Sequence, residues 1–225
     1  MANLLTLALT ETTQTEYEVV AWDLDNKKWV LLPRLPLNTA TVDNTPVWDL
    51  FQVTRAEIMR ANGEQRSNVH VISPRTQPVP VTTIPREDRL DWLNYLSHRN
   101  SVDTPKGTNS FVTLVEPDNI TEIYMQRKEP DNRFDETKPF FWENRIEFFH
   151  NNILWETSRV KVGVPCKDLR WKTYWHEVAF NRDNYFWTAR EKWLNTLRQN
   201  RTFFVIEYYN QHKTYVIAGI HSIRV

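Results

Sequence analysis

The sequence predicts a mainly β protein of the β-rich α+β class, folded as two small barrels with two short peripheral helices. Short runs rich in Val, Ile and aromatic residues recur along the chain and are separated by turn-forming residues. Only two stretches show the periodicity of an amphipathic helix. Twelve prolines divide the remaining chain, a pattern typical of small antiparallel barrels and not of a parallel sheet.

The length of 225 residues is sufficient for two lobes. We predict an N-terminal β lobe over residues 1–80, a linker and helix over 81–110, and a C-terminal β lobe over 111–225 that contains a helix at about 188–198. The linker is placed at 74–85 because its prolines exclude an internal sheet strand. Residues 126–138 are almost wholly polar and predict a mobile loop.

The predicted strands are the runs with the highest content of β-branched and aromatic residues. In chain order they span residues 4–9, 17–22, 28–32, 50–55, 69–72, 111–115, 120–125, 139–142, 146–150, 153–155, 160–164, 202–209 and 215–223. Asp23 and Asp25 lie between the second and third runs, where Asp and Asn favour a tight hairpin turn. A metal site is the alternative for this pair, and turn chemistry is the preferred explanation.

Two helices are predicted from residue spacing and terminal residues. The first covers about 86–98, follows Pro85 at a favourable first position, and has Leu90, Leu93, Leu96 and Trp92 on its apolar side. The second starts at Thr188, where Thr188 and Glu191 match a capping box.

Composition excludes several classes of protein. The four glycines lack the spacing of a phosphate-binding loop or a dinucleotide fingerprint, which argues against an ATPase or an NAD enzyme. The single Cys166 cannot form an internal disulfide, and the sequence has no apolar run of about 18 residues and no signal-peptide pattern. We therefore expect a cytoplasmic protein that has no membrane partner and needs no cofactor.

The net charge is zero, but the charges are divided unevenly along the chain. Residues 1–144 contain 15 Lys or Arg and 21 acids, whereas residues 145–225 contain 13 and 7. The C-terminal part can therefore present a basic face, provided that the separation in sequence persists in space.

The run KDLRWKTYW at Lys167–Trp175 lies within this basic part and is the strongest candidate site. Cations beside flat rings are what a groove for single-stranded nucleic acid requires. The predicted nucleic-acid-binding residues are Arg159, Lys161, Lys167, Arg170, Trp171, Lys172 and Tyr174. The alternative is a strand with ordinary surface charges and with aromatic rings, including Trp175, packed in the core.

Three segments resemble the bacterial dual OB-containing domain family: EYEVVAWDLDNKKWVLL, KDLRW and FFVIEYYNQHKTYVIAGI. The chain departs from the family's pattern at Ala21, at Leu31 or Leu32, and at Leu169, where the family tends to have Gly, a basic residue and Pro. The resemblance implies two OB-like barrels and a nucleic-acid role, often in a mobile-element or antiviral defence system. It carries over no catalytic residue, and only Asp168, Arg170 and Trp171 lie in a motif that implies a site.

Two catalytic arrangements are weaker candidates. Cys166 and His176 suggest a thiol nucleophile and base, although a lone Cys is most often a buried apolar residue. Glu143, Glu147 and His150 suggest a metal-dependent nuclease but lack a supporting Lys or Asp at a recognisable interval. We therefore predict a non-enzymatic module that binds single-stranded or structured RNA or DNA. The alternatives are an interaction subunit of a larger protein complex and a nuclease.

Overall fold

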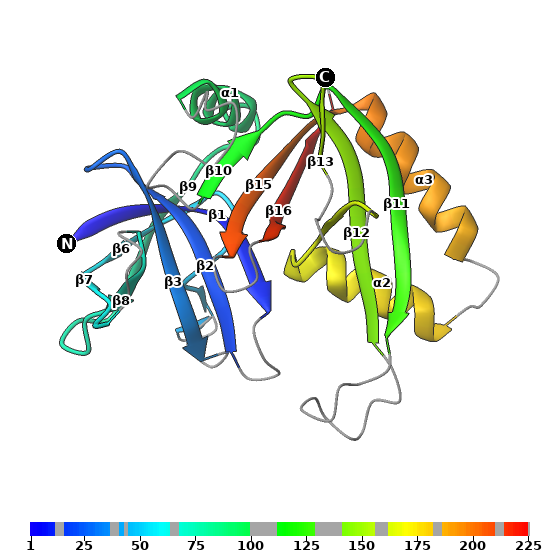
Figure 1. Cartoon of the computed structure of the whole chain (residues 1–225). Coiled ribbons are helices and arrows are strands. Elements are labelled where there is room, and N and C mark those ends of the chain that lie inside the picture. The colour runs from blue at the N-terminus through cyan, green and yellow to red at the C-terminus, as the bar shows by residue number, and fades with distance from the viewer. Residues whose placement is uncertain are drawn as a thin grey trace. The chain divides into compact units, whose positions relative to one another are not determined.

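The computed structural model describes residues 1–11, 16–36, 41–42, 45–63, 68–99, 112–128, 141–155, 162–181, 186–209 and 214–224 (Figure 1). Among the described residues, strand accounts for 56% and helix for 20%, which confirms the mainly β class. The chain divides into two compact units. The first contains Met1–Val115 and Val205–Tyr208, and the second contains Glu116–Phe204 and Tyr209–Val225.

The first unit is built on a five-stranded antiparallel sheet of order β3-β2-β1-β6-β9. Its elements are β1 (Ala2–Glu11), β2 (Glu16–Asp23), β3 (Lys28–Pro36), β4 (Thr41–Val42), β5 (Thr45–Pro46), β6 (Gln52–Ala56), β7 (Ile58–Arg60), β8 (His70–Ile72), β9 (Val79–Thr83), α1 (Arg89–Arg99) and β10 (Val112–Val115). The strands β4 and β5 form one separate pair, and β7 and β8 form another. Figure 1 shows β1, β2 and β3 side by side in blue.

The core of this unit lies on the long strands because both faces of β2 are covered. Seven consecutive residues of β2, from Tyr17 to Asp23, are buried. Leu4, Val19, Val30 and Trp48 pack in one apolar cluster with their neighbours. A strand that alternated polar and apolar residues would leave one face in water, so the run EYEVVAW suits a strand covered on both sides.

The second unit carries strands and two helices. Its elements are β11 (Asn119–Lys128), β12 (Phe141–His150), β13 (Ile153–Trp155), β14 (Val164–Pro165), α2 (Leu169–Asn181), α3 (Phe186–Gln199), β16 (Thr214–Ile223) and the part of β15 (Arg201–Tyr209) outside Val205–Tyr208, which belong to the first unit. The strands β11, β12 and β13 neighbour one another, and β14 pairs with β12. The strands β10, β15 and β16 form a three-stranded sheet in that order. Phe148 is fully buried, and its ring lies 5.5 Å from that of Trp155 and 4.9 Å from that of Phe204.

Two turns follow directly from local chemistry. Asn151 and Asn152 connect β12 to β13 with φ values of 52° and 59°, which Asn tolerates better than most residues and which suit a two-residue hairpin. At the β2–β3 turn, Asp23 Oδ1 accepts hydrogen bonds from the backbone N–H groups of Asp25 and Asn26, both at 3.0 Å. This geometry confirms the turn explanation for the aspartate pair.

The structure differs from the prediction at three places. The described residues contain three helices, because α2 forms where no helix was predicted. The proline-rich span 74–85 contains β9, an edge strand, so Pro80 is tolerated. Of the described part of the predicted strand 160–164, residues 162–164, only Val164 belongs to β14. Residues 156–161 and most of the predicted loop 126–138 lie outside the described residues.

No helix in the described ranges is both long enough and apolar enough to span a bilayer.

Substitution of Gly163 tests the close backbone packing in the second unit. Its φ is +60°, and an added Cβ would lie 2.8 Å from the backbone carbon of Ile146. We expect Gly163→Ala to lower the free energy of unfolding by about 2 kcal/mol or more, through backbone strain and this clash. Gly63→Ala is the matched control, since Gly63 also has positive φ but has nothing within 4 Å. Urea denaturation of both variants checks this, and equal losses would contradict it.

Candidate nucleic-acid interface

Residues 166 and 167, directly before the candidate helix α2, are hydrogen-bonded to two strands. The backbone N–H of Cys166 donates to the carbonyl of Asn144 on β12 at 2.8 Å. The backbone N–H of Lys167 donates to the carbonyl of Ile217 on β16, also at 2.8 Å. Residues 166 and 167 therefore bridge the two strands and fix the point at which the helix starts.

Asp168 is the N-cap of α2 and also ties the helix to β16. Its Oδ1 accepts hydrogen bonds from the backbone N–H groups of Arg170 at 2.9 Å and Trp171 at 3.2 Å. Its Oδ2 accepts a hydrogen bond from the backbone N–H of Ile220 at 2.9 Å. Capping satisfies amides that the first helical turn leaves without partners. The KDLRW motif therefore has a structural role, because Asp168 links the start of α2 to β16.

Arg170 also contacts Asp168 and β16, and its side chain remains accessible to solvent. One guanidinium nitrogen, Nη2, donates to Asp168 Oδ2 at 3.1 Å and to the carbonyl of Ile220 at 2.8 Å. The side chain is nevertheless 57% exposed, whereas that of Asp168 is 4% exposed. In the described part of the chain, Nε and Nη1 of Arg170 make no hydrogen bond or ion pair. The guanidinium is therefore fixed through Nη2, and its other N–H donors can bond to solvent or to a ligand.

The aromatic rings of the segment belong to the packing between α2 and α3. Trp171 is only 5% exposed and Trp175 is fully buried. The ring of Trp193 on α3 lies 5.1 Å from that of Trp171 and 5.4 Å from that of Tyr174. Tyr174 is half-buried in the same cluster. Trp171 is therefore not positioned to stack on a base, and the alternative of core packing holds for this ring.

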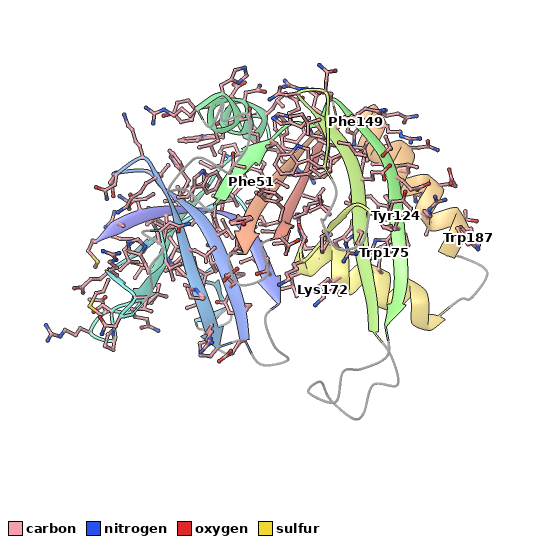
Figure 2. The ribbon with its side chains drawn as sticks, viewed as in Figure 1. Phe51, Tyr124, Phe149, Lys172, Trp175 and Trp187 are labelled. Carbon is pink, nitrogen blue, oxygen red and sulfur yellow. The ribbon has the colours of Figure 1, made fainter. Side chains whose placement is uncertain are left out.

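The predicted cations are only partly brought together by the described structure. Lys167 and Lys172 are half-buried and flank Arg170 in sequence, and Figure 2 shows Lys172 on α2. Arg159 and Lys161 lie outside the described residues. The described candidate interface therefore consists of Lys167, Arg170 and Lys172, named below the α2 cation group.

Other arginines of the basic C-terminal part hold the second unit together. Arg190 Nε donates to the carbonyl of Ile123 at 2.9 Å, and the guanidinium forms an ion pair with Glu122. Arg198 Nε donates to the carbonyl of Ile120 at 2.7 Å, so α3 is joined to β11 at two points. This use of cations is a structural role that counting charges along the sequence cannot show.

Trp187 is an exposed ring that the sequence did not single out. It lies in the first turn of α3 and is 65% exposed (Figure 2). The guanidinium carbon of Arg190 lies 5.4 Å from its ring centroid. The spacing i and i+3 in a helix brings such a pair together, so the signal was present in the sequence.

For the catalytic alternatives, the side chains of Glu143 and His176 lie outside the described part of the structure, and the geometry of the other candidate residues gives no support. Burial raises the pKa of the Cys166 thiol well above its usual value, the opposite of what an active nucleophile needs. Thr121 Oγ1 donates to Glu147 Oε1 at 2.6 Å, and burial together with Glu147 raises the pKa of Tyr124. His150 Nδ1 lies 2.9 Å from the carbonyl oxygen of Glu116. Among the described residues, no group of three His, Cys, Asp or Glu could hold a metal ion.

Comparison with models of known protein families gives no match, and no curated protein sequence matches the chain. The resemblance to the dual OB-containing domain family, with its two OB-like barrels, therefore stays a prediction.

Loss of the Asp168 carboxylate should destabilise the second unit. We expect Asp168→Ala to lower the free energy of unfolding by about 2–4 kcal/mol, because the cap is lost and the Ile220 amide is left without its partner. Glu191→Ala is the control, since it removes only an exposed ion pair with Arg190 and should cost less than about 1 kcal/mol. Chemical denaturation measures both, and a loss for Asp168→Ala as small as the control's would contradict the structural role.

The thiol of Cys166 should be inert in the folded protein. Because the side chain is buried and its pKa is raised, an aromatic disulfide reagent at neutral pH should label it only after denaturant is added. Rapid stoichiometric labelling of the native protein would show that the thiol is accessible and would reopen the nucleophile hypothesis.

Proposed function

We propose that the protein is a non-enzymatic module that binds single-stranded or structured RNA or DNA through the phosphate backbone, using the α2 cation group. The observation that carries this proposal is the state of Arg170. Its guanidinium is fixed by Asp168 and Ile220 through one nitrogen and is 57% exposed. A guanidinium held in place loses less conformational entropy on binding a phosphate than a free side chain would.

The carboxylate next to Arg170 does not cancel this positive surface. Asp168 is buried and directs its oxygens to two backbone amides of α2 and one of β16, as well as to Arg170. The negative charge thus lies beneath the surface, while the Arg170 side chain, which is 57% exposed, carries positive charge that a ligand can meet. Phosphate contacts of this kind provide affinity without sequence preference.

The proposal differs from the sequence-based hypothesis in the role of the rings. Trp171 is packed against α3, so it acts by supporting the helix and not by stacking on bases. We place this activity in the cytoplasm, in a mobile-element or antiviral defence system as the family resemblance implies.

Binding should weaken with salt and should depend on the α2 cation group. A labelled single strand of about 20 nucleotides should bind in the micromolar range or tighter at low salt. For Lys167→Gln/Lys172→Gln we expect the slope of log affinity against log salt to fall by about 1.4, since each phosphate contact contributes about 0.7. Adding Arg170→Gln should weaken binding further. Fluorescence anisotropy at several salt concentrations measures these changes.

Lys192→Gln/Arg224→Gln is the control of equal charge change, because it also removes two cations of the second unit, both of them exposed and outside the α2 cation group. It should leave the salt slope near that of the unchanged protein, and thermal melting should show that all variants are folded. Equal effects of the two double variants, or no binding at low salt, would contradict the proposal. In that case an interaction subunit becomes the function to test, since Met59 and Val71, partners across β7 and β8, are 44% and 40% exposed.

A further inference from the structure

The first unit contains an open pocket of about 550 Å³ between the β2–β3 turn and α1. Its lining residues are Trp22, Leu24, Lys27, Asp88, Asp91, Trp92 and Tyr95. Asp88, Asp91, Trp92 and Tyr95 follow one another at intervals of three or four residues, or lie side by side, and so share one face at the start of α1. The pocket therefore combines three aromatic rings with two acidic side chains.

The rings offer faces in different directions. Trp22 is almost fully buried and forms the inner wall, whereas Tyr95 is 42% exposed at the rim. The rings of Trp92 and Tyr95 lie 5.9 Å apart at an angle of 85°. Rings set at right angles can present a face and an edge to the same small ligand, and the electron-rich face attracts a cation.

The pocket contains two exposed carboxylates, those of Asp88 and Asp91. In the described part of the chain, neither carboxylate accepts a hydrogen bond or forms an ion pair. Two carboxylates without an ion-pair partner among the described residues, beside three aromatic rings, favour a positively charged ligand with apolar surface. An inorganic cation would find no group of ligating side chains, since the described residues hold none suited to a metal.

The pocket is preformed. The β2–β3 turn is fixed by Asp23, which accepts hydrogen bonds from the backbone N–H groups of Asp25 and Asn26 and from the side-chain amide of Asn26. Trp22 packs edge-to-face on Trp29 with ring centroids 5.4 Å apart. A site whose walls are already ordered requires little reorganisation on binding.

We propose that this pocket binds an organic cation, either a methylated ammonium or a guanidinium group. Arg99 supports the proposal, because its guanidinium carbon lies 5.3 Å from the ring centroid of Tyr95 and shows that this ring accepts a cation on its face. Lys27 is the opposing feature, since it lines the same pocket and its positive charge repels a positive ligand.

Two matched pairs of probes test the proposal on the full chain. Choline is compared with its neutral tert-butyl analogue, and acetyl-arginine amide with acetyl-citrulline amide. Each pair keeps the shape and changes the charge. Heteronuclear NMR titration should show saturable shifts of the amide signals of Asp91, Tyr95 and the Trp92 indole with the charged member only. A trimethyllysine peptide then distinguishes a chain-borne cation from a free one by its relative affinity.

The variants are expected to change the affinity for the charged probe in opposite directions. Trp92→Leu and Asp91→Asn should each weaken binding of the charged probe by about fivefold to thirtyfold. Lys27→Gln should strengthen binding, and Tyr95→Phe should retain it because the ring remains. Trp187→Leu removes an exposed ring of the second unit and is the control that should change nothing. Asp91 is exposed, so Asp91→Asn tests the site even if Trp92→Leu does not fold.

The outcomes divide clearly. Saturation by charged probes with these variant effects supports the proposal. Absence of shifts, equal binding of charged and neutral probes, or weaker binding in Lys27→Gln overturns it. Nucleic-acid binding is measured separately through the α2 cation group, so failure of one proposal leaves the other standing.

Discussion

The second unit depends on one buried carboxylate. Asp168 accepts hydrogen bonds from two amides of α2, one amide of β16 and the guanidinium of Arg170. A buried charge without such partners is strongly disfavoured, so these four donors must remain close together. They fix where α2 begins and how it meets β16. The packing of Trp171 against Trp193 follows, because the first turn of α2 determines where its rings point.

Several arginines of this unit link one element to another. Their positive charges therefore serve the fold and are not all available to a ligand. Arg190 and Arg198 bond to backbone carbonyls of β11, and Arg201 forms a two-point ion pair with Glu116 at 2.8 and 2.7 Å. A planar guanidinium with several donors is suited to this role, whereas an ammonium group is not. Arg170 differs from these three because, among the described residues, hydrogen bonds of its guanidinium come from Nη2 alone, and its side chain is 57% exposed.

The sequence was sufficient where a local pattern decides the structure. The hairpin at Asp23 was predicted because turn residues act over a few positions. The helix predicted at about 188–198 is α3, but α3 already includes Phe186, so Thr188 lies inside the helix and the predicted capping box is wrong. Helix α2 was missed although Asp168 is a good N-cap, since aromatic residues also favour strands. Burial of Trp171 depends on α3, which follows later in the chain, and no local pattern contains it. The pocket likewise joins Trp22 and Trp92, which lie 70 positions apart in the sequence.

The most direct test follows the Arg170 side chain itself. In protein carrying labelled arginine, the Nε–H signal of Arg170 is monitored by NMR while a single-stranded oligonucleotide is added. The account predicts a saturable, salt-sensitive shift of this signal, with the indole signal of the buried Trp171 changing little. A large shift of the Trp171 indole with the Arg170 signal unmoved, or no change in either, would contradict it.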